Sequence, residues 1–237
     1  MSHIKVMQIK AKLLSLFEAH LDVRDISTKD KERETKILSR CLAAAAIRLK
    51  TGCTEKDAAT AVWDGADDNG IDAAYFDPSE SRVIFVQSKL IQKGSGEPEA
   101  KDIGAFIKGV RDAIESDNDN FHQRLQGKLN DICQKLLTPG TSILIVIATT
   151  GTNNLAKHSS SIIDGFLDDL NENDPDGIVS SEVLGLHDIY AALANDSAAG
   201  APTIEANITD WSYVSSPYPA RRCDSWVRTR VEVAACP

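Results

Sequence analysis

Residues 67–89 read Asp-Asp-Asn-Gly-Ile-Asp-Ala-Ala-Tyr-Phe-Asp-Pro-Ser-Glu-Ser-Arg-Val-Ile-Phe-Val-Gln-Ser-Lys, and this stretch decides the fold. An acidic turn that contains glycine leads into the apolar run 73–76. A second turn at 77–80 contains proline and precedes the apolar run 82–86. β-Branched and aromatic residues on both sides of a proline-containing turn predict a β-hairpin.

The end of this hairpin gathers polar side chains. Alternation along the second strand places Gln87 and Lys89 on one face and Ser88 on the other. Asp72, at the start of the first strand, can lie across from the face of Gln87 and Lys89. The Asp72 carboxylate, the Gln87 amide oxygen and the Ser88 backbone carbonyl are oxygen ligands of the kind that Mg²⁺ prefers. Lys89 would orient a water molecule or stabilise charge on a phosphate, which suits metal-assisted hydrolysis of phosphodiesters.

Two motifs carry a family resemblance: Asp68-x-Gly70-Ile71-Asp72-Ala73 and Val86-Gln87-Ser88-Lys89, with Asp72 and Gln87 fifteen positions apart. They resemble the PD-(D/E)XK nuclease superfamily. The most similar groups are the N-terminal domain of abortive-infection phage-resistance (AIPR) proteins and the Mrr-like restriction endonucleases. The resemblance implies an α/β fold of restriction-endonuclease type, with a mixed sheet, an αβββαβ core and N-terminal helices. It spans about residues 30–220.

The resemblance also implies the composition of the metal site. Mg²⁺, with Mn²⁺ as a substitute, would be bound by Asp72, Gln87 and the carbonyl of Ser88. A glutamate on the helix before the hairpin often completes such a site, and Glu34 is the candidate. Glu32 and Glu18 are alternatives, and a solvated helix acid is the other interpretation of Glu34. Gln87 stands where many members of the superfamily have glutamate, and an amide binds a cation more weakly than a carboxylate.

The remaining pattern alternates helices and strands. Apolar spacing predicts helices over residues 4–21, 31–50, 102–137 (with an interruption near 116–120), 153–170 and 188–193. Thr54, followed three residues later by Asp57, predicts a helix start with a capping box. The uninterrupted apolar run 142–148 predicts a strand that is buried on both faces, and 179–186 predicts a further strand. This order predicts a mixed sheet with helices packed on it.

Composition narrows the class of protein. The chain has 237 residues, 42% hydrophobic and 26% charged, as in ordinary globular proteins. No apolar run reaches the length of a membrane span and the N-terminus lacks the apolar core of a signal peptide, so we expect a cytoplasmic protein without a membrane partner. Neither a zinc site nor a disulfide framework is indicated by the spacing of Cys41, Cys53, Cys133, Cys223 and Cys236.

The net charge and the positions of the basic residues bear on the kind of partner that the protein binds. The formal net charge of −9 argues against broad affinity for nucleic acid, yet acids can lie far from a local basic face. A group of basic residues lies around and after the hairpin and is expected to form either such a face or an ordinary solvated surface: Arg82, Lys89, Lys93, Lys101, Lys108 and Arg111. The expected partner is nucleic acid, DNA in the first place. A homodimer is expected by analogy only, because cleavage of two strands by one site needs a dimer or two visits.

Three segments are expected along the chain. Residues 1–30 form an N-terminal helical extension, 31–220 the nuclease domain, and 221–237 a non-native or disordered tail. The tail has four Arg and no Lys, unlike the residues before it. The segment 211–220 resembles the end of the AIPR N-terminal domain, so we expect that the gene is truncated or frameshifted after about Ala220.

Two functions follow from these motifs, and a third does not depend on them. The first is a metal-dependent nuclease that acts against phage or other foreign DNA. The second is a truncated, weakly active or inactive nuclease-like module that binds nucleic acid or a partner protein. The third is a soluble α/β interaction domain without any role on nucleic acid.

Overall fold

The computed structural model describes residues 2–63, 65, 68–116, 120–172, 177–197, 207–215 and 225–232. Side chains of 196–197, 207–215 and 225–232 are not described. Two compact units divide the chain, Met1–Ser197 and Ala198–Pro237. The first unit carries the hairpin and its surrounding helices.

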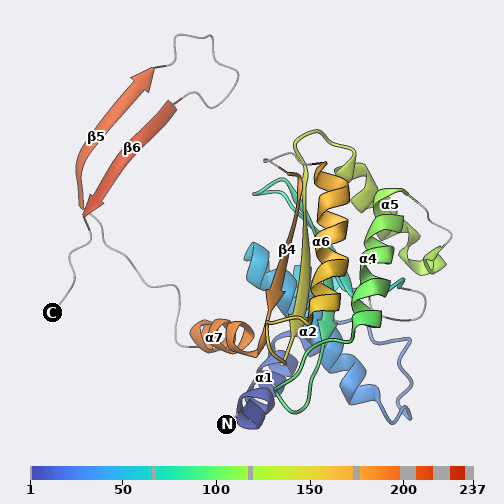
Figure 1. Ribbon diagram of the computed structural model, residues 1–237. Helices are drawn as coiled ribbons and strands as arrows, with labels where there is room; N and C mark the ends of the chain where they lie inside the picture. Colours follow the sequence, from blue (N-terminus) through green and yellow to red (C-terminus); the bar gives the residue numbers. More distant parts are fainter. Residues whose placement is uncertain are drawn as a thin grey trace. The chain divides into compact units, whose positions relative to one another are not determined.

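The first unit is a mixed α/β layer structure around a four-stranded sheet of order β1-β2-β3-β4 (Figure 1). The strands are β1 (Ala73–Asp77), β2 (Arg82–Lys89), β3 (Ser142–Thr149) and β4 (Val179–Leu184). β1 and β2 form the predicted antiparallel hairpin, while β2, β3 and β4 run parallel. The mixed sheet with flanking helices is therefore confirmed.

Helices cover both faces of this sheet. One layer contains α1 (Ser2–Phe17), α2 (Arg33–Thr51), α3 (Glu55–Thr60) and α7 (Leu186–Ser197). The other contains α4 (Ala100–Ile114), α5 (Gln126–Leu136) and α6 (Lys157–Asn171). The 3₁₀ turn η1 (Glu18–His20) follows α1, and η3 (Gln123–Leu125) precedes α5. Figure 1 shows α4 and α6 side by side along the sheet.

Strand β2 is buried on both sides because its apolar residues alternate between the two layers. Ile84 and Val86 pack toward α2, whereas Val83 and Phe85 pack toward α4 and α5. The alanine-rich middle of α2 (43–46) is fully buried and lets this helix lie close to β2. Burial of this much apolar surface is the main force that holds the hairpin between the layers.

The observed order of elements differs in one respect from the αβββαβ core that the resemblance implies, in which three strands follow one another. α4 and α5 separate β2 from β3, so the order from α3 to β4 is α-β-β-α-α-β-α-β. The outer edge of β1 is met by Ala61–Trp63, through an isolated antiparallel bridge between Val62 and Ala73 and a bond from Trp63 N–H to the Asp72 carbonyl (2.7 Å). The restriction-endonuclease-like arrangement in particular stays a prediction.

Several predicted boundaries are close to the observed ones. The Thr54 hydroxyl accepts a hydrogen bond from the Asp57 N–H (3.1 Å), which confirms the helix cap. The long predicted helix 102–137 is split into α4, η3 and α5, and residues 117–119 of its expected interruption lie outside the described residues. Within the described residues, no helix is long and apolar enough to cross a membrane.

The two units of the structure do not coincide with the three segments expected from the sequence. α1, in the expected extension, contributes Ile9, Leu13 and Phe17 to the core of the first unit. In the second unit, β5 (Asn207–Ser215) pairs antiparallel with β6 (Ser225–Glu232). The expected boundary at Ala220 lies outside the described residues, and the non-native origin of 221–237 stays a prediction.

Candidate functional site at the end of the hairpin

The structure brings Asp72 and Ser88 into direct contact. The Asp72 N–H donates to the Val86 carbonyl (2.9 Å), directly before β1 begins with the pair of Ala73 and Val86. Asp72 Oδ2 accepts hydrogen bonds from the Ser88 N–H (2.6 Å) and lies 2.8 Å from the Ser88 hydroxyl. The carboxylate is therefore held at the carboxyl end of β2 by Ser88, whose side chain lies on the α2 side of the sheet, whereas the sequence suggested a position across from the face of Gln87 and Lys89.

Helix α2 reaches this point through Ser39. The Ser88 hydroxyl lies 3.1 Å from both the carbonyl oxygen and the hydroxyl of Ser39, and its single proton goes to one of these two oxygens or to Asp72. Glu34 is exposed in the first turn of α2, about 7–8 Å along the helix axis from Ser39. Among the described residues, no hydrogen bond joins Glu34 to Asp72 or Ser88, so the structure does not bring this acid to the hairpin end.

Gln87 holds an unsatisfied atom. Its side-chain oxygen Oε1 is buried and has no hydrogen-bond partner among the described residues. A buried acceptor without a donor costs on the order of 1–3 kcal/mol, and such atoms in folded proteins usually have a reason. A bound cation would supply the positive partner that this oxygen lacks.

Lys89 lies on the face opposite to Ser88, as the alternation predicts. Its ammonium group is 2.5 Å from Asp102 Oδ2, in the first turn of α4. The Lys89 side chain is 43% exposed and that of Asp102 20%. The sequence analysis did not single out Asp102, because an acid in the first turn of a helix is favoured by the helix dipole alone and gives no separate signal.

Asp68, the first acid of the motif, stabilises the loop that precedes β1 by accepting hydrogen bonds from its backbone. Its carboxylate accepts hydrogen bonds from the N–H groups of Gly65 (3.1 Å) and Gly70 (2.9 Å). Burial raises the pKa of this carboxyl, although the two backbone bonds and the charges of Arg124 and Arg40 act in the opposite direction. Asp67 lies outside the described residues.

The same loop is attached tightly to α4. A Cβ atom on Gly109 would lie 1.9 Å from the Asn69 carbonyl oxygen, so only glycine permits this approach. Asn69 itself donates to Asp112 Oδ2 (2.7 Å) on the next turn of the helix. Asn69 and Gly70 both have positive φ (54° and 78°), a conformation that asparagine and glycine tolerate best. The Asn-Gly pair therefore sets the turn that delivers Asp72.

The donor set fits a hydrated Mg²⁺ only in part. Within the described part of the chain, no group of three or more His, Cys, Asp or Glu side chains is arranged to hold a metal. The hairpin end offers the Asp72 carboxylate and the Gln87 amide oxygen, and Asp102 is a second carboxylate beside Lys89. Mg²⁺ keeps several water ligands, so one or two carboxylates can suffice.

The cations that follow the hairpin are largely paired with acids. Lys89 pairs with Asp102, Lys101 with Glu99, Lys108 with Asp112 and Arg111 with Asp169. Such pairing reduces the net positive charge of the surface that the sequence suggested as a phosphate-contacting rim.

Comparisons of the chain with protein-family models, with curated proteins and with solved structures find no significant match. The resemblance to PD-(D/E)XK nucleases and AIPR proteins therefore stays a prediction from the two motifs.

Proposed function

We propose that this chain is a Mg²⁺-dependent nuclease that hydrolyses phosphodiester bonds of nucleic acid, DNA in the first place, in defence against phage. One observation carries the proposal: Asp72 is bonded to Ser88 at the hairpin end, and the neighbouring residue Gln87 has a buried Oε1 without a hydrogen-bond partner among the described residues. Asp72 and Gln87 would hold Mg²⁺, or Mn²⁺ in its place, with the Ser88 carbonyl. Glu34 is an optional further ligand that would have to approach from its exposed position.

Each side chain would have a separate role. A bound Mg²⁺ supplies Lewis-acid stabilisation of the negative charge on the phosphate. Lys89 would place its ammonium group beside the same phosphate and stabilise charge there. Its partner Asp102 keeps the ammonium in position before nucleic acid binds.

The test is cleavage of plasmid DNA, linear duplex DNA, single-stranded DNA and RNA with Mg²⁺ or Mn²⁺, each against EDTA. We expect metal-dependent cutting that is lost in Asp72→Asn and Lys89→Ala and retained in Lys93→Ala, an exposed lysine next to the site. Cutting that is unaffected by both substitutions would exclude this site. A plaque assay with wild type and Asp72→Asn tests the role in defence, and light scattering tests the proposed homodimer.

A nuclease-like module that binds without cutting is the second candidate. The presence of Gln87 in place of an acid favours it, as does the ion pair that holds Lys89 on Asp102. This module predicts binding of nucleic acid in EDTA together with no cleavage by the pure wild-type protein in either metal.

A further inference from the structure

Helix α1 carries two separate apolar stripes. The first is buried in the core of the first unit and consists of Val6, Ile9, Leu13 and Phe17. The second, here called the outer stripe, lies on another face of the same helix and consists of Ile4, Met7, Ala11 and Leu14. Its members follow one another at intervals of three, four and three residues, the spacing by which one helix packs lengthwise on another.

The outer stripe is open to solvent. Ile4 is 61% exposed and Met7 57%, Ala11 is exposed, and Leu14 is half-buried against the core. Four large apolar side chains are exposed among the described residues, and the other two are Leu137 and Ile178. Single exposed apolar residues are ordinary, whereas a continuous stripe of them marks a surface for interaction.

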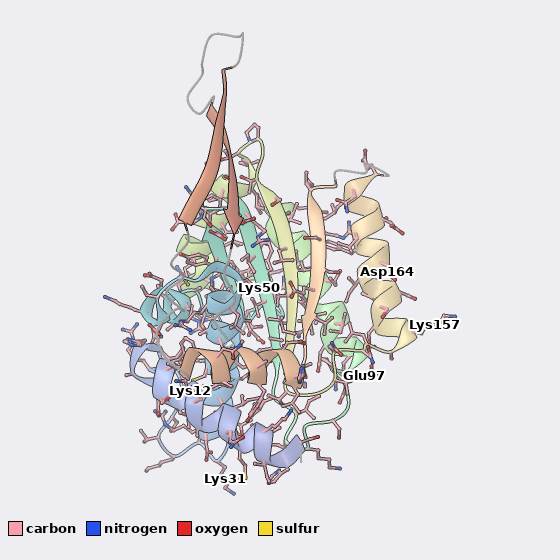
Figure 2. The ribbon with its side chains drawn as sticks, turned by 90° about the vertical axis from the view of Figure 1, so that its left-hand side faces the viewer. Lys12, Lys31, Lys50, Glu97, Lys157 and Asp164 are labelled. Carbon is pink, nitrogen blue, oxygen red and sulfur yellow. The ribbon has the colours of Figure 1, made fainter. Side chains whose placement is uncertain are left out.

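The lysines of α1 contact their own chain on either side of this stripe. Lys10 donates to the side-chain oxygen of Gln92 in the loop after β2. Lys5 lies 4.9 Å from the centre of the Tyr190 ring, and Lys12 lines a hollow between α1 and α7 (Figure 2). A helix that lies on an anionic membrane has cations that are available beside its apolar face. The outer stripe therefore fits a protein partner better than a lipid surface.

The outer stripe is complementary to itself when two copies of α1 run antiparallel. Across a two-fold axis, a residue that meets a second residue in the other copy is matched by the reverse contact. One register places Ile4 opposite Leu14 of the second copy and Met7 opposite Ala11 of the second copy. The small Ala11 leaves room for the long Met7 side chain, so large and small residues alternate along the contact.

The charge pattern selects the same register. The first turn of α1 contains no acidic residue, so the positive end of its helix dipole has no acid of its own helix beside it. Glu18 is exposed and follows Leu14 by one helical turn. When Leu14 lies opposite Ile4 of the second copy, Glu18 lies beside the N-terminus of the second α1. The two-fold axis repeats this contact at the other end.

We propose that the outer stripe of α1 is the interface of a homodimer, in which two copies of α1 pack antiparallel. The proposal rests on the proposed function only for the existence of a homodimer, because the contact needs neither metal nor nucleic acid. α1 has 16 residues and is about 24 Å long. One such helix pair buries less than the roughly 1,200 Å² of stable interfaces, so we expect a dissociation constant of about 10–100 μM.

The experiment is sedimentation velocity of the full chain over a range of concentrations on both sides of this constant. Ile4→Glu and Met7→Glu each place a carboxylate on the outer stripe, at side chains that are more than half exposed and not needed in the core. Leu137→Glu is the matched control, because it changes an equally apolar side chain, 72% exposed, directly after α5. Glu18→Lys tests the contact with the helix N-terminus. Melting temperatures show whether each variant is folded.

We expect Ile4→Glu and Met7→Glu to raise the dissociation constant roughly tenfold or more, and Leu137→Glu to match the wild type. Glu18→Lys should raise it roughly three- to tenfold. A wild type that stays monomeric at every concentration would overturn the proposal, as would equal constants in all four variants.

The antiparallel register has a separate test. A mixture of Met7→Cys and Ala11→Cys chains should form more disulfide-linked dimer under mild oxidation than either variant alone, with oxidised wild type as the control for the native cysteines. Cross-linking of Met7→Cys alone at the level of the mixture would overturn this register. Binding of a monomeric wild type to vesicles of phosphatidylcholine and phosphatidylserine, lost in Met7→Glu, would assign the outer stripe to a membrane and overturn the dimer.

The outcome for the interface can be told apart from the outcome for the nuclease. A dimer that Met7→Glu dissociates, in a wild type that cuts nothing with Mg²⁺ or Mn²⁺, would support the interface and overturn the nuclease. Metal-dependent cutting by a strictly monomeric wild type would do the reverse.

Discussion

The hydroxyl of Ser88 and the carboxylate of Asp72 lie 2.8 Å apart, and the Ser88 N–H donates to the same carboxylate oxygen at 2.6 Å. One residue of β2 thus fixes the acid that directly precedes β1 through both its backbone and its side chain. The same hydroxyl reaches Ser39 of α2, so it connects the hairpin end to the helix layer.

We expect Ser88→Ala to lower the free energy of unfolding by about 1–2 kcal/mol, because the substitution removes a buried hydroxyl that bonds Asp72 and Ser39. Denaturant unfolding measures this difference. Ser161→Ala is the control, since the Ser161 hydroxyl is exposed and bonds only within α6. Equal stability of the two variants would contradict the role of Ser88.

Gly109→Ala should destabilise the fold by about 2–3 kcal/mol, because its Cβ would collide with the Asn69 carbonyl at 1.9 Å. Gly104→Ala, one and a half turns earlier in α4, meets nothing within 4 Å and should stabilise by about 0.5–1 kcal/mol through helix propensity. Thermal melts of the two alanine variants should therefore move in opposite directions. A Gly109→Ala variant as stable as Gly104→Ala would show that the loop is not docked on the helix.

Asp112 should make stability depend on pH. Burial disfavours its charged form, but hydrogen bonds from Lys108, Asn69 and Asn120 outweigh that effect, and its pKa lies below the usual range. A carboxyl with a lowered pKa stabilises the fold above its unfolded pKa of about 3.9, and the contribution disappears as the pH falls through the folded value.

Asp112→Asn should accordingly lose on the order of 1–2 kcal/mol at pH 7. The difference from wild type should shrink below about pH 4. Urea unfolding at several pH values tests this, with Asp164→Asn on the outer face of α6 as the control (Figure 2). A difference that stays constant from pH 7 down to the acid range would mean that the carboxylate charge is not what stabilises the loop.

If the chain cleaves nucleic acid, Asp102→Asn should reduce the cleavage rate by roughly tenfold or more, because Lys89 would lose the partner that positions it. Stability should change by less than about 1 kcal/mol, since this ion pair is partly exposed. Glu99→Gln removes a nearby exposed acid that pairs with Lys101 and should leave the rate unchanged. Equal rates in Asp102→Asn and wild type would exclude a positioning role for Asp102.

Divalent cations should raise the melting temperature if the hairpin end holds one. Mn²⁺ at millimolar concentration should increase the melting temperature of wild type, EDTA should reverse the effect, and Asp72→Asn should abolish it, because a ligand that binds only the folded state stabilises it. Ca²⁺ provides a comparison for ionic effects that do not depend on the site. A shift in Asp72→Asn equal to that of wild type would place any bound ion elsewhere.

The local elements could be predicted because their signals are local. The Pro-containing turn, the alternation that separates Ser88 from Lys89 and the cap of Thr54 all depend on residues close in sequence. The partners of the polar groups could not be predicted in this way. Ser39 meets Ser88 across 49 positions, and Asp102 meets Lys89 only because α4 folds back along β2.

Glu34 is the clearest case of a residue whose position could not be predicted from the sequence. Sequence reasoning proposes an acid on the helix before the hairpin, but the rotation and offset of α2 relative to β2 depend on how its alanine face packs on the sheet. That packing puts Ser39 at the hairpin end and leaves Glu34 exposed.

Helix α4 touches both halves of the hairpin end: Asp102 pairs with Lys89, and Gly109 and Asp112 hold the loop that leads to Asp72. A shift of this one helix would therefore move the lysine's partner and the acid's loop in the same step. The two groups cannot be adjusted independently from that side. A protein or ligand that bound the exposed face of α4 and shifted the helix would therefore change the positions of Asp72 and Lys89 together. It would need no contact with either residue.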